Sequence, residues 1–252
     1  MLIDYKKANI VQQDGTTVLQ DVDFHVDEGE FIYIIGRVGS GKSSLLKTLY
    51  FELDLDEAEN AIVLNHDLRG LKRKYVPALR RQMGIIFQDF QLLSDRTVHD
   101  NLAFVLKATG WKDKQEIEER INDVLEDVEL QEYADRFPHE LSGGEQQRVA
   151  IARSMLNHPK IIIADEPTGN LDPDTAAHII SLLRQVTQSG TAVVMTTHNI
   201  PLLDEYPGIV YRCIDHRLEE ITNDYNKMAL TEEEEASEQQ AVDYSTREDL
   251  SM

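Results

Sequence analysis

The chain has 252 residues, with 46 acidic and 25 basic side chains and a formal net charge of −21. Non-specific binding to nucleic acids depends on lysine and arginine side chains that neutralise the phosphates. A surface with this much negative charge repels those phosphates, so general binding to DNA or RNA is disfavoured. The single cysteine, Cys213, excludes an internal disulfide and is expected to be a small buried residue. No signal-peptide pattern is present and the apolar runs are too short to cross a bilayer, so we expect membrane contact only through a partner protein.

Apolar periodicity predicts strands that alternate with helices. Residues 22–26 alternate apolar and polar side chains, and the buried run 31–35 leads through a Gly-rich loop into a helix at 42–50. From 89 to 140 the character is helical, and 117–128 carries an amphipathic stripe. This order is typical of an α/β fold with a mostly parallel sheet and a helical insertion. Further strands are predicted at 61–64, 84–87, 161–164, 192–196 and 209–214, and further helices after Ser142 and near 176–186.

The C-terminal residues 223–252 differ from the rest of the chain in composition. They hold nine acidic and two basic residues, a net charge of −7, and few apolar side chains to bury. Such a composition predicts a solvated, disordered tail.

A phosphate-binding loop is predicted between the strand at 31–35 and the helix at 42–50. The sequence GRVGSGKS has the complete GxxxxGK[ST] spacing, in which glycines let backbone N–H groups turn toward phosphates at a helix N-terminus. We expect Lys42 to reach the β- and γ-phosphates and Ser43 to bind Mg²⁺. A plain Gly-rich turn explains the glycines but not this Lys-Ser pair. The predicted nucleotide-binding residues of this region are Gly36, Arg37, Val38, Gly39, Ser40, Gly41, Lys42, Ser43 and Ser44.

Two adjacent carboxylates, Asp165 and Glu166, end the predicted strand 161–164. Buried acids are costly unless they are paired or metal-bound, so this position predicts a Mg²⁺ site. We expect Asp165 to hold the metal through water and Glu166 to polarise the attacking water. A strand that simply runs out into solvent is the alternative, and the phosphate-binding loop upstream weighs against it.

A second anion site is predicted in the sequence LSGGEQQR at 141–148. Ser142 and Glu145 form the S-x-x-E pattern of a helix capping box. The pair Gly143-Gly144 exposes the backbone at that helix N-terminus, where anions bind.

LSGGEQQR resembles the signature motif of ATP-binding cassette proteins, and the other motifs of that family follow in order. Gln88 resembles the Q-loop glutamine that senses Mg²⁺ and nucleotide, Asp172 lies in a D-loop-like GNLD sequence, and His198 is similar to the switch histidine that faces the γ-phosphate. The resemblance implies ATP and Mg²⁺ as ligands, and a signature motif that closes on the nucleotide of a second copy. The implied catalytic residues are Glu166, His198, Gln88 and Lys42, the implied metal ligands Ser43, Gln88 and Asp165, and the further nucleotide contacts Val11, Ser142, Gly143, Gly144, Glu145 and Asp172.

The family's architecture is expected over residues 1–222. It is a P-loop NTPase with a mixed sheet core, an antiparallel β subdomain and a helical subdomain, here at about 89–146. The adenine position departs from the family pattern, because Val11 or Gln12 stands where an aromatic ring is usual and Tyr5 is not expected to replace it. Stacking of a base on an aromatic ring contributes about 1–3 kcal/mol, so weaker discrimination for adenine is predicted.

Segments 71–81 and 87–98 narrow the resemblance to the cell-division branch of the family, although Ser94 replaces an expected proline. That branch implies a homodimer on ATP binding, an FtsX-like integral membrane partner that controls cell-wall hydrolases, and a peripheral place on the cytoplasmic face of the bacterial inner membrane. Lipoprotein-releasing and macrolide-type exporters share nearly all catalytic motifs and are the alternative. Residues 69–81 hold six bases and no acid, which predicts a solvated helix face or, second, a surface that attracts anionic headgroups or an acidic loop of the partner.

Overall fold

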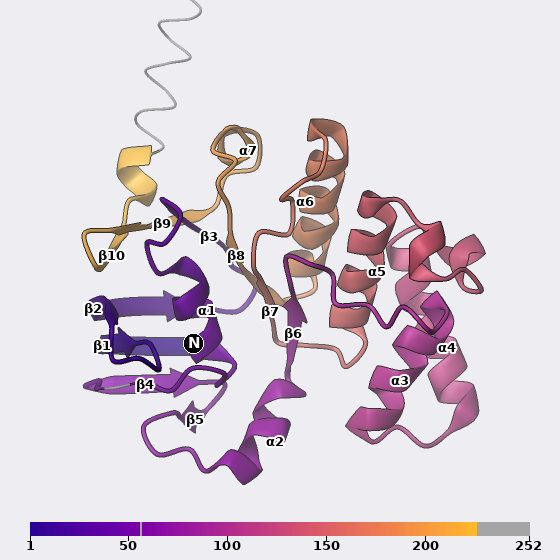
Figure 1. The fold of residues 1–252 in the computed structure, drawn as a ribbon, viewed down its shortest axis with the longest axis horizontal. Coiled ribbons are helices and arrows are strands. Elements are labelled where there is room, and N and C mark those ends of the chain that lie inside the picture. Colours follow the sequence, from indigo (N-terminus) through magenta and orange to yellow (C-terminus); the bar gives the residue numbers. More distant parts are fainter. Residues whose placement is uncertain (56, 226–252) are drawn as a thin grey trace, which may run out of the picture.

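A six-stranded sheet forms the centre of the computed structural model, which describes residues 1–55 and 57–225 (Figure 1). Its strand order is β10-β9-β3-β8-β7-β6. The five strands β9, β3, β8, β7 and β6 run parallel to one another, and the edge strand β10 pairs antiparallel with β9. The strands are β3 (Phe31–Gly36), β6 (Met83–Ile86), β7 (Ile161–Ala164), β8 (Ala192–Thr196), β9 (Ile209–Ile214) and β10 (Arg217–Glu220).

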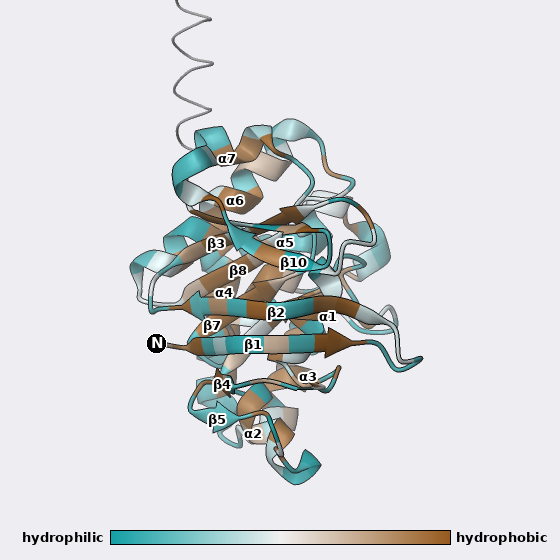
Figure 2. Ribbon diagram, turned by 90° about the vertical axis from the view of Figure 1, so that its left-hand side faces the viewer, coloured by the Kyte–Doolittle hydropathy of each residue, from teal (hydrophilic) through white to brown (hydrophobic). Residues whose placement is uncertain are grey.

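A second, antiparallel sheet lies to one side of the first, at the left of Figure 1. Its order is β2-β1-β4-β5, with β1 at Ile3–Val11, β2 at Thr17–Val26, β4 at Asn60–Val63 and β5 at His66–Asp67. Along β1 and β2, hydrophilic and hydrophobic residues alternate, as expected for strands with one buried and one solvated face (Figure 2).

Most of the longer helices begin at a side chain that caps the first turn. Thr97, Asp113, Ser142 and Asp172 each accept a hydrogen bond from a backbone N–H one turn ahead. The helices are α1 (Lys42–Leu49), α2 (Val76–Arg80), α3 (Val98–Thr109), α4 (Lys114–Asp127), α5 (Gly143–Met155), α6 (Pro173–Gln188) and α7 (Pro201–Glu205), with 3₁₀ turns at Arg73–Tyr75, Gln131–Tyr133 and Pro138–Glu140.

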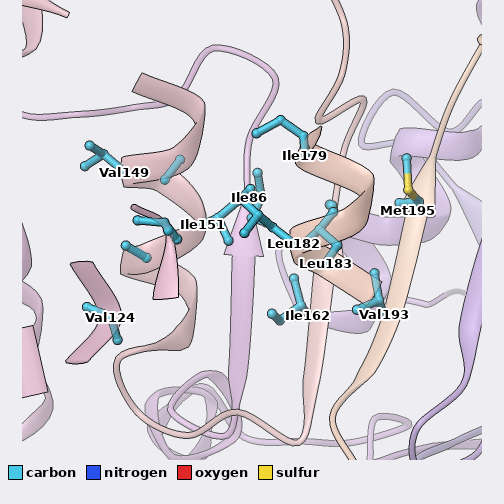
Figure 3. Close-up of a cluster of buried hydrophobic side chains, with 14 of the residues drawn as sticks. Ile86, Val124, Val149, Ile151, Ile162, Ile179, Leu182, Leu183, Val193 and Met195 are labelled. Carbon is cyan, nitrogen blue, oxygen red and sulfur yellow. The ribbon is translucent and has the colours of Figure 1, made fainter. Parts of the chain in front are cut away.

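The six-stranded sheet separates two hydrophobic cores, because successive side chains of each strand point to opposite faces. Ile32, Ile34 and Val194 join the core under the antiparallel sheet and α1. Val193 and Met195 join the other core, where β6, β7 and β8 meet α4, α5 and α6 (Figure 3). Both faces are covered, which explains why these strands read as continuous apolar runs.

Most predicted elements are confirmed. The strands at 161–164, 192–196 and 209–214 have the predicted bounds, and the stripe at 117–128 is buried on α4. Sequence analysis missed β1, the ten-residue extent of β2, and the short strands β5 and β10. The insertion contains α3 and α4, but residues 89–97 form an irregular loop rather than helix.

The predicted acidic tail falls mainly on residues outside the described part of the chain. Residues 223–225 are described, and they continue a helical turn in which the Tyr225 hydroxyl donates to Asp204 Oδ1 at 2.6 Å. The boundary at residue 222 and the nature of the tail stay predictions. In the ranges 1–55 and 57–225, no helix is both long enough and apolar enough to span a bilayer.

Candidate active site

The loop between β3 and α1 requires glycine at two positions. Gly36 and Gly41 have φ angles of 148° and 102°. A Cβ on Gly36 would lie 2.6 Å from the Cys213 carbonyl oxygen, and a Cβ on Gly41 would lie 2.5 Å from Val18 Cγ1. Gly41 is the N-cap of α1 and has no side chain to occupy the first-turn N–H groups, which leaves them available to an anion.

Lys42 folds back over this loop. Its ammonium donates to the carbonyl oxygens of Gly36 at 3.0 Å and Arg37 at 3.2 Å, and the residue is only 5% exposed. The buried Ser40 hydroxyl has no hydrogen-bond partner among the described residues. A buried polar orphan inside a ring of backbone donors and one cation fits a loop whose missing partner is a phosphate.

Asp165 lies beside Ser43, as the sequence predicts. The Ser43 hydroxyl donates to Asp165 Oδ1 at 3.1 Å, and the Thr196 hydroxyl donates to the same oxygen at 2.7 Å. Thr196 Oγ1 also accepts the backbone N–H of Glu166 at 2.9 Å. A hydroxyl and a carboxylate form the oxygen donor set that Mg²⁺ prefers, so these residues fit the ion. Sequence analysis missed Thr196, which ends β8 and binds a carboxylate 31 positions away in the chain.

Glu166 and His198 form a close pair. Glu166 Oε1 lies 2.5 Å from His198 Nε2, and the glutamate backbone has a φ of 48°, which turns the chain sharply at the end of β7. His198 Nε2 also lies 3.3 Å from Lys42 Nζ. When the imidazole proton is on Nε2, this nitrogen donates to the Glu166 carboxylate. It then has no lone pair to accept a hydrogen bond from the Lys42 ammonium. Three predicted catalytic side chains therefore meet at the carboxyl edge of the sheet.

Gln88 and the signature motif border one cleft of about 860 Å³. Its lining includes Gln88, Asp165 and Gly143, so the Q-loop candidate does face the predicted metal site. Within residues 1–55 and 57–225, however, no hydrogen bond or ion pair links the signature residues to Lys42 or Ser43. One chain thus brings together the phosphate loop, the acids and His198, but not the signature.

The signature residues form the predicted capping box. The Ser142 N–H donates to Glu145 Oε2 at 2.7 Å, and the Glu145 N–H donates to Ser142 Oγ at 3.3 Å. The Ser142 hydroxyl also donates to Glu145 Oε2 at 2.8 Å, and this bond, together with the one from the Ser142 N–H, holds the pKa of Glu145 below its usual value. Gly144 packs against α6 close to the D-loop sequence, since a Cβ on Gly144 would lie 2.6 Å from Thr175 Cγ2. Thr175 in turn donates to Asp172 at the start of α6.

Val11 stands at the position where the family pattern places an aromatic ring against adenine. Val11 ends β1, where it pairs with Thr17, and it is half-buried. Tyr5 is fully buried, and its hydroxyl donates to Thr48 Oγ1 at 3.1 Å, which removes it from the nucleotide side.

Most of the six basic side chains in the run 69–81 interact with other residues of the chain. Arg69 pairs with Asp67 at 2.7 Å, and Arg80 and Arg81 donate to backbone carbonyls. The three central bases, residues 72–74, are exposed at the 3₁₀ turn before α2, where Arg73 Nη2 lies 3.8 Å from Asp54 Oδ2. This arrangement favours the solvated face over a continuous basic surface.

Comparisons with known proteins agree with this geometry. The family model for ABC transporters matches residues 19–169. The cell division ATP-binding protein FtsE of Streptococcus pneumoniae (strain D39) is 44% identical over 191 residues, which cover 76% of this chain and 82% of that protein. The Escherichia coli (strain K12) protein of the same name is 42% identical over 202 residues, 80% of this chain and 90% of its own. The ATP-binding cassette MJ0796, solved as a dimer bound to ADP and Pi after hydrolysis, is 31% identical with a TM-score of 0.77, over 87% of this chain and 98% of that one.

Proposed function

Because the chain belongs to the ABC transporter family, we propose that it is the ATP-hydrolysing subunit of an FtsE–FtsX-like bacterial membrane complex. ATP-driven dimerisation of the chain then acts on an FtsX-like transmembrane partner that regulates cell-wall hydrolysis during division. The relatives in Streptococcus pneumoniae and Escherichia coli are named cell division proteins, which favours this role over a lipoprotein-releasing or macrolide-type exporter. Such a partner places the chain peripherally on the cytoplasmic face of the inner membrane.

One observation carries the catalytic part of the proposal. The chain is an ATPase of this family, and the side chains of Lys42, Ser43, Asp165, Glu166 and His198 meet at the carboxyl ends of β3, β7 and β8. Ligands of open parallel sheets bind at this edge, and here it combines a cation, a metal-binding pair and a base. No other cluster of these groups among the described residues joins a phosphate loop.

The nucleotide phosphates bind in the loop Gly36–Ser44, with Lys42 turned from its carbonyl partners toward the phosphates. Ser43, Asp165 and Gln88 are the residues that would hold Mg²⁺, and the ion would supply charge neutralisation at the phosphate oxygens. Thr196 fixes Asp165 for this role through its hydroxyl.

Glu166 positions and polarises the attacking water. Its side chain is 21% exposed, so water can reach the carboxylate while His198 holds it. The backbone bond to Thr196 fixes the same residue from the other side. His198 is a positioning residue for Glu166 and the neighbour of Lys42, which leaves it next to the γ-phosphate.

Two copies complete the sites. Among the described residues, no hydrogen bond joins Ser142, Gly143, Gly144 or Glu145 to the phosphate loop of their own chain. As the family resemblance implies, these residues serve the nucleotide of the second copy, with Asp172 beside them at the interface. ATP that contacts both copies only in the closed form shifts the equilibrium toward closure by its differential affinity. The dimeric MJ0796 cassette supports this arrangement.

The experiment that tests the function is affinity purification of the Glu166→Gln variant from native membranes with MgATP. The variant holds ATP without turnover, so the partner complex accumulates. An FtsX-like four-helix membrane protein with a large extracytoplasmic domain supports the proposal. Recovery of a lipoprotein-release or efflux permease in its place would contradict the division role, while the ATPase chemistry would stand.

A further inference from the structure

The loop that follows Gln88 bends at two consecutive non-glycine residues. Phe90 and Gln91 have φ angles of 59° and 48°, a region that L-residues adopt at a cost and that surrounding contacts must hold. Arg153, in the last turn of α5, binds both peptides. Its Nη2 donates to the Phe90 carbonyl at 2.7 Å, and its Nη1 donates to the Gln91 carbonyl at 2.6 Å. Because guanidinium donors form a rigid fork, this pair of bonds fixes the orientation of the loop as well as its position.

The remainder of the loop is bound to α3. Asn101 is 3% exposed, and its Nδ2 donates to the carbonyls of Leu93 at 3.0 Å and Thr97 at 2.9 Å. Its Oδ1 accepts the Leu93 N–H at 2.7 Å. From Phe90 onward the loop therefore belongs to the helices. Only residues 87–89 connect it to the end of β6, and Gln88 is the middle one.

Helix α5 connects this attachment to the signature motif. The helix has 13 residues, about 20 Å at 1.5 Å per residue, with Ser142 at its N-cap and Arg153 in its last turn. Its far end rests tightly on β6, since a Cβ on Gly84 would lie 2.5 Å from the Ser154 carbonyl oxygen. Figure 1 shows α5 between this strand and the helices α3 and α4. Because the helix is continuous from Ser142 to Arg153, a tilt of its signature end also turns the residue that holds the loop.

The Arg153 guanidinium is costly to detach. Burial lowers its pKa, and the nearby carboxylate of Asp89 opposes that shift. A desolvated cation without its carbonyl acceptors loses hydrogen bonds that are stronger than neutral ones. The loop and α5 therefore move together.

We propose that Arg153 is a positioning residue that transmits movement of the signature helix to Gln88 of the same chain. Each subunit then adjusts its own metal site in response to the nucleotide that its signature contacts in the partner. The inference rests on the proposed function of Gln88 as a metal ligand and of the signature as a contact to the second copy.

The test compares Mg²⁺-dependent ATP turnover of the full chain in Arg153→Met, Gln88→Ala and the double variant. Arg120→Met is the matched control, because Arg120 donates to the carbonyls of Met155 at 2.6 Å and Leu156 at 3.1 Å at the same end of α5 without touching the loop. We expect Arg153→Met to lower kcat about 10- to 100-fold. It should also raise the half-saturating Mg²⁺ concentration, with the KM for ATP within about twofold of wild type. Arg120→Met should leave kcat within about threefold of wild type.

The double variant separates positioning from a structural role. If Arg153 acts through Gln88, Arg153→Met removes nothing further in the Gln88→Ala background. Equal losses in both backgrounds, or an equal loss in Arg120→Met, would overturn the inference. If thermal unfolding shows that Arg153→Met does not fold, Arg153→Lys replaces it, with the same non-additivity expected. Wild-type turnover in the same series tests the proposed function separately, because an inactive wild-type chain would contradict that function rather than the role of Arg153.

Discussion

Thr196 binds the Asp165 carboxylate and the backbone N–H of Glu166, and its replacement by valine is the sharpest perturbation of the site. Valine keeps the shape and the β-strand preference of threonine but removes the hydroxyl. The side chain is fully buried, so the Glu166 N–H loses its acceptor and Asp165 loses a donor at 2.7 Å. A lost bond to a charged group costs about 1.5–3 kcal/mol, and a neutral bond about 0.5–1.5 kcal/mol. Together they predict a loss of about 2–4.5 kcal/mol in the free energy of unfolding.

The control is Thr48→Val. Thr48 is equally buried and also makes two hydrogen bonds, to the Leu45 carbonyl at 2.7 Å and from Tyr5 at 3.1 Å, but touches neither carboxylate. Urea unfolding measures the stability of both variants, and steady-state ATP hydrolysis measures turnover. We expect both variants to be destabilised and Thr196→Val alone to lose more than about tenfold in kcat. Equal turnover in the two variants would refute the argument that Thr196 positions the acids.

Three further results are expected. Glu166→Gln should lower turnover by about 10²–10⁴ while ATP binding persists, as measured by single-turnover kinetics and equilibrium binding, and near-normal turnover would remove the glutamate from the role of base. GTP should compete effectively with ATP, because Val11 replaces the stacking ring, and poor competition in a displacement assay would contradict this view of the adenine edge. Ser142→Ala should lower stability by about 0.5–2 kcal/mol through loss of the helix cap. The folded-state pKa of Glu145 is depressed, so the stabilisation from its bonds to Ser142 is present above the unfolded pKa and is lost as pH falls through the folded pKa. Acid titration should therefore show that Ser142→Ala costs less stability at low pH. A cost that does not change with pH would be inconsistent with the capping box.

Local patterns predicted most of the site. The phosphate loop, the acids that follow β7 and the capping box at Ser142 depend on neighbouring residues, and the structure places them as expected. The apolar runs of β7 and β8 were equally plain, because both faces of the sheet are covered.

The missed features depend on contacts between distant parts of the chain. Strand β1 has three register irregularities and charged residues in its middle, which obscure a period of two. Thr196 binds a residue that lies 31 positions away in the sequence, and Arg153 binds one that lies 63 positions away. No local pattern marks such partners. The meeting of the signature with a second phosphate loop is likewise a property of two chains, which the family resemblance suggested and residue patterns did not.

The central claim, that ATP joins two copies through the signature motif, is tested most directly by the mass of the Glu166→Gln variant in solution. Light scattering should give the 28.8 kDa of one chain without nucleotide and twice that mass with saturating MgATP. Gly143→Asp added to Glu166→Gln is the control. A Cβ at Gly143 fits, with its nearest neighbour, Leu171 Cδ2, at 3.7 Å, and the added negative charge at this helix N-terminus repels the phosphates. The account predicts that this double variant binds ATP and stays a monomer. A single-chain mass for Glu166→Gln with bound ATP, or a dimer that the Gly143 substitution leaves intact, would contradict it.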